Sequence, residues 1–277
     1  MTQGVHESSP VLNAIRIDAR NPGPMTGAGN STYLIAGPAG SRLLIDAGVG
    51  QPEHLGELTS LLREDELRLD HVLVTHGHAD HVSGVSAIAA AHPESRFHKY
   101  PRPDEDHHHG VVWRPAVDGT AFDAAGGRLL ALHTPGHAPD HLAFWQEASR
   151  TVFSGDLVVL GGSVMIHASR GGDLRQYLSS LERLLTLDPA VLLPAHGPAI
   201  TRPAVVLRAY LDHRRRREEQ VLSALAGGRG TVPAIAESIY DGLDPALMPA
   251  AHENVRAHLD KLKQEGRAFE NDARWTL

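Results

Sequence analysis

Short apolar runs and longer stretches of periodically spaced apolar residues alternate along the first 200 positions. Strands are predicted by the short, almost wholly apolar runs at 31–37, 41–48, 69–75, 127–134, 141–146, 150–159 and 190–197. Helices are predicted where apolar residues recur every three or four positions, at 54–67, 83–92 and 173–185. Segment 96–128, rich in proline, aspartate and histidine, is expected to form loops. Two successive strand-rich halves that each close with helices predict an α/β fold whose sheets are covered by helices.

The pattern changes at Pro203, where the chain becomes helical. Three helices and a β-ribbon are predicted, at 204–228, 231–240, 249–266 and 267–277. The long first helix ends at Gly227-Gly228, and the ribbon is expected to turn at Asn271-Asp272. Helices followed by a short hairpin are typical of a winged-helix module. We therefore expect a main domain over residues 1–203, and a helical linker with a winged-helix-like domain over 204–277. The glycine pair is the alternative boundary.

Composition restricts the chemistry that the protein can carry out. The chain has 277 residues, of which 19 are histidine and none is cysteine. A chain of this length can bury a sizeable core without covalent cross-links. The missing cysteines exclude disulfides, thiolate metal sites and a cysteine nucleophile. Any bound metal must therefore be held by imidazole and carboxylate groups, which suit zinc, iron, manganese or nickel.

The acidic charge is confined to the first two hundred residues. The formal net charge is -7, and residues 203–277 hold 11 Lys/Arg and 11 Asp/Glu, so the whole excess lies in 1–202. An acidic main body is the opposite of the basic surface expected of a nucleic-acid-binding protein. The polar N-terminus does not resemble a signal peptide, and no apolar stretch reaches the roughly 20 residues of a membrane span. We expect a cytoplasmic protein with no membrane partner.

Three histidines and an aspartate follow the apolar run 69–75 within six residues. A buried strand that ends at Thr75 releases the chain at the carboxyl edge of its sheet, where α/β folds place ligand sites. His76 and His78 alternate, so in an extended segment both can point the same way. Asp80 and His81 follow as the chain turns, and reach a second point nearby. One metal ion cannot use all four side chains comfortably, but two adjacent ions can.

Three further potential ligands follow strands in the same manner. His137 lies on a Pro-Gly turn after one strand, Asp156 follows a glycine after a second, and His196 precedes a glycine after a third. One such case is ordinary, but four converging strand ends are not. They predict a metal site at a single edge of the fold.

These motifs resemble the series found in the metallo-β-lactamase fold superfamily. The matching motifs, over residues 11–200, are His76-x-His78-x-Asp80-His81, Thr134-Pro135-Gly136-His137, Gly155-Asp156 and Ala195-His196-Gly197. The segments NPGPMTGAGNSTYLIAG, TPGHAPDH and PAHGPAI, with the helical tail, resemble more closely the β-lactamase-like protein 2 family, over nearly the whole chain. The resemblance implies an αββα sandwich followed by a small winged-helix-like domain.

The resemblance also implies a site for two divalent metal ions, with zinc as the first candidate. The implied ligands of the first ion are His76, His78 and His137. The implied ligands of the second ion are Asp80, His81 and His196, with Asp156 bridging the two.

A pair of such ions can share a hydroxide that attacks a carbonyl or phosphoryl group, without a serine or cysteine nucleophile. We assign catalytic roles to Asp80 and to His141. His141 lies four residues after His137 and is expected to bind substrate or to stabilise an oxyanion. Asp46 ends another strand and is expected to accept a hydrogen bond from a metal-bound histidine, which fixes the tautomer of that ring.

Several polar segments near these motifs remain open in role. Asn30-Ser31-Thr32 either borders the cleft or forms a turn, and His167, Ser169 and Arg170 are candidates for substrate contact. The run His107-His108-His109 has no strand behind it, and we expect a solvated loop.

The run Arg214 to Arg217 is followed by two glutamates on a helix, a pattern typical of a solvated, internally paired face rather than of an RNA-binding surface.

Three activities are compatible with such a site. The hypothesis that we favour is a dinuclear metal hydrolase acting on a small ester, thioester or lactone-like acyl substrate. The alternative is a metal-dependent single-strand endoribonuclease, which the family resemblance favours and the acidic main body opposes. The third is an iron-dependent oxidation of a thiol compound at a single ion. Nothing in the sequence argues specifically for β-lactam binding.

The winged-helix-like tail could also act as a DNA reader beside a metal sensor. Its helix around residues 255–265 carries Arg256, Lys261 and Lys263, but also two acidic residues. The small net positive charge of this helix argues against contacts with DNA phosphates. We favour a role in homodimerisation, or as one wall of the active-site cleft.

Overall fold

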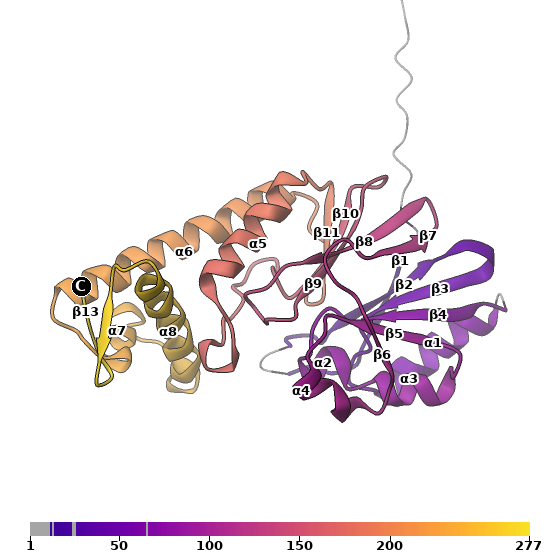
Figure 1. The fold of residues 1–277 in the computed structure, drawn as a ribbon, viewed down its shortest axis with the longest axis horizontal. Coiled ribbons are helices and arrows are strands. Elements are labelled where there is room, and N and C mark those ends of the chain that lie inside the picture. Colours follow the sequence, from indigo (N-terminus) through magenta and orange to yellow (C-terminus); the bar gives the residue numbers. More distant parts are fainter. Residues whose placement is uncertain (1–11, 13, 24–25, 65) are drawn as a thin grey trace, which may run out of the picture.

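Two β-sheets lie face to face between layers of helices in the computed structural model, which describes residues 12, 14–23, 26–64 and 66–277 (Figure 1). The first sheet has the order β1-β2-β3-β4-β5-β6. Its strands are Ala14–Asp18 (β1), Ser31–Ala36 (β2), Ser41–Ile45 (β3), Arg68–Leu73 (β4), Arg96–Lys99 (β5) and Trp113–Pro115 (β6). The antiparallel hairpin of β2 and β3 was predicted from the sequence and is confirmed. From β3 to β6 the strands are parallel.

The second sheet has the order β11-β10-β9-β8-β7. Its strands are Ala121–Ala124 (β7), Gly127–His133 (β8), Leu142–Gln146 (β9), Thr151–Gly155 (β10) and Val191–Pro194 (β11). All its pairs are antiparallel except that of β10 with β11. The predicted ligands follow β4 in the first sheet and β8, β10 and β11 in the second.

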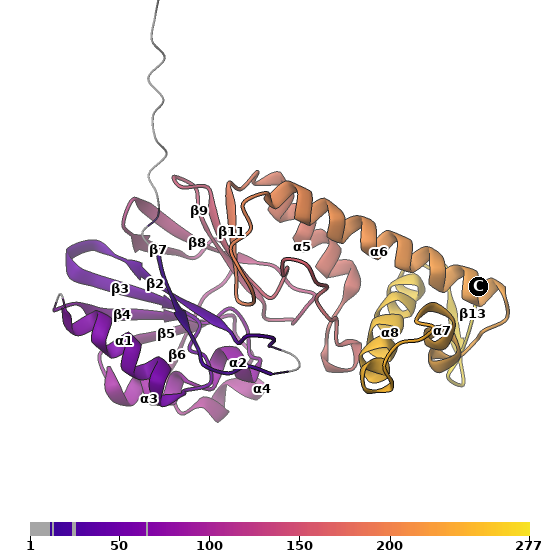
Figure 2. The same cartoon turned by 180° about the vertical axis from the view of Figure 1, so that it is seen from behind.

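The central strands of each sheet are buried on both faces, which explains why β2, β3, β9 and β10 are almost continuously apolar. One core lies between the sheets and contains Ile35, Leu73, Phe144 and Phe153. On its outer face, the first sheet packs against α1 (Pro52–Glu64) and α3 (Val85–Ala91). The second sheet is covered by α5 (Leu174–Thr186) and by the first half of α6 (Pro203–Ala226), as Figure 2 shows from behind. The result is the expected αββα sandwich.

The loop prediction for residues 96–128 is wrong. The segment contains β5, β6 and β7, the short helix α4 (Pro103–Asp106) and a 3₁₀ turn at His107–His109. These strands have only three or four residues each, too few for alternation to be visible among so many polar residues. They form because β5 and β6 extend an existing parallel sheet at its edge. β1 was likewise not predicted.

A separate small unit follows at the far end of α6 (Figure 1). It comprises α7 (Val232–Ile239), α8 (Met248–Gln264) and the ribbon of β12 (Phe269–Asn271) with β13 (Arg274–Thr276). Its core joins the last part of α6 to the predicted apolar face of α8, where Val255, Leu259 and Leu262 are fully buried.

The ribbon turns at Asp272 and Ala273, both with positive φ, one residue later than predicted.

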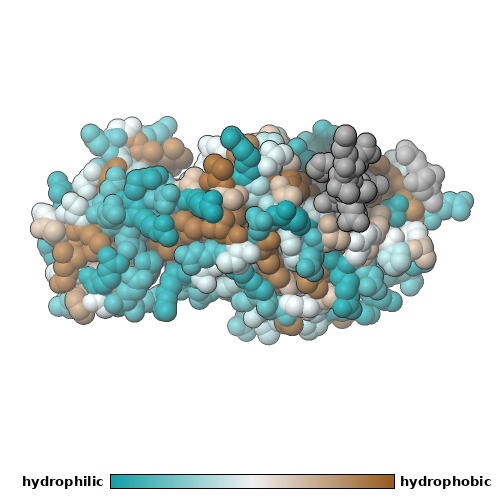
Figure 3. All heavy atoms as spheres, turned by 90° about the horizontal axis from the view of Figure 1, so that it is seen from above, coloured by the Kyte–Doolittle hydropathy of each residue, from teal (hydrophilic) through white to brown (hydrophobic). Residues whose placement is uncertain are grey.

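Polar and apolar side chains are mixed on the face of the molecule that Figure 3 shows. Figure 3 shows hydrophilic side chains along the whole visible face, with hydrophobic residues in smaller groups between them. Within the described residues, no helix is both long and apolar enough to cross a membrane.

Candidate metal centre

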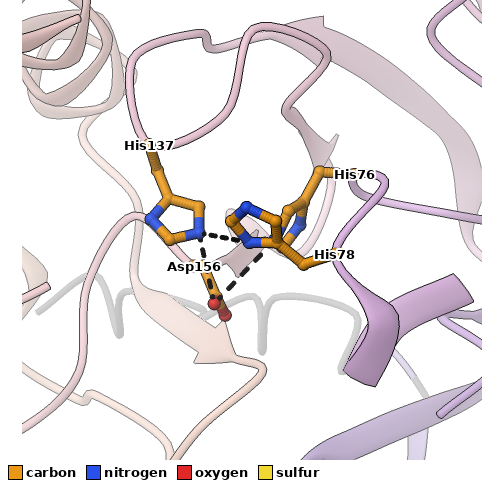
Figure 4. A group of neighbouring side chains, drawn as sticks. All are labelled: His76, His78, His137 and Asp156. Atoms are coloured by element: carbon orange, nitrogen blue, oxygen red, sulfur yellow. Dashed lines mark hydrogen bonds and ion pairs between the residues drawn. The ribbon is translucent and has the colours of Figure 1, made fainter. Parts of the chain in front are cut away.

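Three imidazoles converge where β4 and β8 end. His76 and His78 lie in the short connection between β4 and α2 (Ala79–Val82), and His137 lies in the loop between β8 and β9. His76 Nε2 lies 2.8 Å from His78 Nδ1, which lies 3.0 Å from His137 Nε2. Asp156, directly after β10, completes the group, with Oδ2 at 3.5 Å from His137 Nε2 and 4.0 Å from His76 Nε2 (Figure 4).

A second group forms on the other side of Asp156. Asp80 and His81 lie on α2, and His196 follows β11. His196 Nε2 lies 3.4 Å from Asp80 Oδ2 and 3.3 Å from Asp156 Oδ1. His81 Nε2 lies 3.6 Å and 3.4 Å from the same two atoms. All seven residues expected as ligands are thus brought together, in the two groups that the resemblance implied.

The shared carboxylate of Asp156 gives the site its form. One oxygen faces each group, and Oδ1 is buried without a hydrogen bond to any described residue. Imidazole nitrogens and carboxylate oxygens within 4.8 Å of one another are a donor set suited to divalent transition metals. The residues present therefore fit a pair of cations, one on each side of Asp156.

Asp46 fixes the orientation of His81, as expected. Asp46 Oδ2 lies 2.8 Å from His81 Nδ1, so this nitrogen donates and Nε2 faces the site. Thr75, which sequence reasoning missed, links the same carboxylate to His76. Its hydroxyl donates to Asp46 and lies 3.0 Å from His76 Nδ1. Both Asp46 and Thr75 are buried. The only sequence signal for Thr75 is a hydroxyl at the end of an apolar run, directly before the first ligand.

The ring of His137 is held by a loop that lies distant in sequence. Its Nδ1 lies 3.1 Å from the carbonyl oxygen of Met165, which leaves Nε2 directed at His78. A backbone carbonyl as a partner leaves no mark in the sequence, because every residue carries one.

His141 does not occupy the position that a substrate contact requires. Its side chain is fully buried, and both ring nitrogens are used inside the protein. Nδ1 lies 2.9 Å from Thr134 Oγ1, and Nε2 accepts the backbone N–H of Asp156 at 3.1 Å. A Cβ on Gly155 would lie 2.5 Å from His141 Nε2, so only glycine admits this contact. The predicted role is corrected: His141 positions Asp156.

Asn30 lies beside the second group. Its amide donates to the backbone and side-chain oxygens of Asp80, each at 3.1 Å. Ser31 and Thr32 belong to β2 and are buried, so the three residues are not a simple turn. The backbone N–H of Ser31 donates to Ala195 O at 2.7 Å, and this bond ties β2 to the loop that carries His196.

The histidines of the two groups differ in their affinity for protons. Burial lowers the pKa of His76 well below its ordinary value, and lowers that of His78 to about 3. Burial also acts on His196, but the adjacent carboxylates of Asp156 and Asp80 outweigh it and raise its pKa to about 10. The carboxylates of Asp156 and Asp46 likewise raise the pKa of His81 against the effect of burial. Cations bound here would have to displace protons from the second group.

The remaining candidate segments lie outside both groups. His107 and His108 are exposed, in line with a solvated turn. Arg214 is buried, which corrects the expectation that the whole run 214–217 is solvated. Its guanidinium contacts the carbonyl of Val164 and lies over the ring of Tyr177.

The imidazole ring of His167 lies 6.4 Å from that of His78, and Arg170 lines a cavity beside His78.

Comparison with known families agrees with this architecture. The chain matches the model of the metallo-β-lactamase superfamily over residues 25–196, and that of the β-lactamase associated winged helix domain over 231–275. The protein therefore belongs to the metallo-β-lactamase superfamily of metallo-hydrolases. The expected winged-helix domain is confirmed.

The chain is similar in sequence to three known proteins. A β-lactamase-like protein 2 homolog of Drosophila melanogaster is 32% identical over 267 residues, which covers 92% of this chain and 89% of the relative. An atrochrysone carboxyl ACP thioesterase of Aspergillus chevalieri is 34% identical over 235 residues, 82% and 72% of the two chains. A protein solved in a di-iron-bound form is 30% identical, with a TM-score of 0.56 over 69% of this chain and 96% of the other.

Proposed function

We propose that the protein is a dinuclear metal-dependent hydrolase of small acyl substrates. The observation that carries the proposal is the pair of ligand groups that share the carboxylate of Asp156. Among ester, thioester and lactone-like bonds, we place thioesters first. The support for this choice is the identity of 34% to a protein named as a thioesterase.

Two divalent cations held by the ligand groups on either side of Asp156 would supply a water molecule of lowered pKa and a positive charge beside the reacting oxygen. The chain's own residues keep the site in order. Asp46 and Thr75 hold the rings of His81 and His76, so that Nε2 of each faces the site. His141 accepts the backbone N–H of Asp156 and so holds the start of this residue in place. No side-chain nucleophile is required.

We propose zinc as the resident metal, with iron as the alternative. Imidazole and carboxylate donors suit both ions. A relative solved in a di-iron-bound form supports iron as the metal to compare with zinc. Elemental analysis of the protein as purified distinguishes the two.

The test is a substrate panel on metal-quantified protein. Nitrophenyl esters, acyl thioesters and lactones are assayed with and without EDTA, beside labelled single-stranded RNA. We expect thioester hydrolysis that EDTA abolishes and that added zinc restores. Chelator-sensitive cleavage of RNA without acyl hydrolysis would replace this proposal with the endoribonuclease alternative.

A further inference from the structure

A cavity of about 400 Å³ opens beside the first ligand group. His78 forms part of its wall, and the loop that carries His137 forms another part through Asp140. The rest of the lining comes from Arg102 and Glu105 near α4, and from Arg170 of the 3₁₀ turn Ala168–Arg170. The cavity is therefore placed to hold a group of the substrate that is attached to the reacting bond.

The other charged side chains along this cavity have oppositely charged neighbours. Asp140 is buried and lies 3.4 Å from the ammonium group of Lys99, which is itself buried and also pairs with Asp106 at 2.5 Å. Arg102 pairs with Glu105 at 2.7 Å.

Arg170 is different, because no carboxylate within the described part of the chain lies within 4.0 Å of its guanidinium. It is exposed and lines the cavity, and although the carboxylate of Glu253 lies in the same region, the guanidinium makes no ion pair with it and can bind a ligand.

The turn that carries Arg170 is held in place by the C-terminal part of the chain. The backbone N–H of Ser169 donates to Glu253 Oε2 on α8 at 3.0 Å. Arg214 of α6 binds the carbonyl of Val164, a few residues before the turn. The same segment supplies Met165 O to the ring of His137. The position of Arg170 relative to the ligand group is thus set by contacts on both sides of the segment.

We propose that this cavity is a subsite for an anionic group of the acyl substrate, a phosphate or a carboxylate, which Arg170 binds. The inference rests on the proposed function and adds the substrate class: acyl compounds that carry a negative charge away from the reacting bond. A guanidinium binds either oxyanion through charge-assisted hydrogen bonds. A neutral substrate with the same acyl group would fill the cavity without making the contact between an anionic group and Arg170.

Matched substrates separate the two sources of the anion. The first pair is one acyl group carried on pantetheine and on pantetheine 4′-phosphate. The second pair is a thioester of a monocarboxylic acid and that of the dicarboxylic acid of equal length. Arg170→Met is expected to lower kcat/KM about tenfold for the charged member of one pair, the loss of about one charge-assisted hydrogen bond. The neutral member should be unaffected, and Arg170→Lys should recover part of the loss.

Arg175→Met is the matched control, since Arg175 is an exposed arginine on α5 that does not line the cavity. It should leave all four substrates unchanged. Equal losses on neutral and charged substrates after Arg170→Met, or no loss on either charged one, would overturn the subsite.

Calorimetric binding of pantetheine 4′-phosphate and of a free dicarboxylate gives a readout without turnover. Arg170-dependent binding of either ligand without hydrolysis of any thioester would retain the subsite and reject the proposed reaction. Hydrolysis of charged and neutral thioesters at equal rates would retain the proposed reaction and reject the subsite.

Discussion

Asp156 is the side chain on which the proposed site depends most, because each of its oxygens faces a different ligand group. Asp156→Ala and His78→Ala are each expected to remove turnover. The loss should exceed the roughly 10–100-fold that removal of an outer hydrogen-bonding partner costs. Metal content by elemental analysis and kcat/KM on the best substrate measure the effect.

The control for these variants is His108→Ala, an exposed histidine outside both groups. It should keep activity and metal content. Circular dichroism should show that all three variants retain the fold. Wild-type activity in either ligand variant would contradict the ligand assignment.

His141 gives a second prediction at the residue scale, because it acts through Asp156 rather than on substrate. His141→Phe keeps a buried ring but loses the bonds to Thr134 and to the Asp156 backbone. We expect kcat and metal affinity to fall by roughly 10–100-fold with KM unchanged. A rise in KM alone, with metal affinity intact, would restore the substrate contact that the sequence suggested.

The convergence of the seven expected ligands could be predicted because they are distinctive residue types in short segments that follow apolar strands. The groups that orient them could be predicted only in part. Asp46 was found, since a carboxylate at a strand end is conspicuous. Thr75 and the carbonyl of Met165 were not, because a hydroxyl and a backbone oxygen are common and gain their role only from folding. His141 was singled out from the sequence, but its contact with the buried backbone of Asp156 was not predicted.

At the scale of elements, the loop that presents His137 depends on close contact with α5. Gly136 has φ +129°, and a Cβ there would lie 2.2 Å from the backbone nitrogen of Tyr177. Gly136→Ala must therefore move the helix or the loop. We expect a loss of about 2–6 kcal/mol in the free energy of unfolding, the sum of backbone strain and overpacking. Urea denaturation measures it.

Gly119→Ala serves as the comparison for this variant. Gly119 also has a positive φ, +81°, but a Cβ there would meet no atom within 4 Å. Only the strain of about 1–3 kcal/mol should remain. If both variants lost the same free energy of unfolding, the contact with α5 would not contribute to the cost of a side chain at position 136.

Long periodic elements were predictable from the sequence, and short edge strands were not. The helices α5, α6 and α8 repeat their apolar pattern over several turns, so packing and pattern agree. β5 and β6 contain four and three residues, and form because an existing sheet offers them a partner. Such pairing depends on residues that are distant in sequence, so a local pattern cannot predict it.

For the whole molecule, α6 is the element that joins the two parts. Leu207 and Leu211 belong to the core under the second sheet, whereas Val221 and Leu225 belong to the core of the C-terminal unit. One helix thus contributes to two cores. The domain boundary at residue 203 stays a prediction, because pattern alone cannot divide a helix that both parts use.

A buried histidine at this junction predicts how stability changes with pH. Both ring nitrogens of His258 on α8 lack a hydrogen-bond partner among the described residues. Burial, and then the charges of Arg214, Arg217, Lys261 and His213, lower its pKa well below the ordinary value. The unfolded chain therefore binds a proton near pH 6.5 that the folded protein does not. The contribution of His258 therefore lowers the free energy of unfolding as the pH drops below about 6.5.

His258→Leu should make this fall less steep, by at most about 1.4 kcal/mol per pH unit. Urea denaturation at pH 7 and pH 5 measures the slope. His252→Leu, on the same helix and partly exposed, is the control and should keep the wild-type slope. An unchanged slope in His258→Leu would show that His258 takes up its proton in the folded protein.

The dinuclear site is tested most directly by anomalous X-ray diffraction from crystals grown with zinc. We expect two peaks about 3.5–4 Å apart, one on each side of the Asp156 carboxylate. His76, His78 and His137 should surround one, and Asp80, His81 and His196 the other. A single peak, or density away from these side chains, would contradict the dinuclear site.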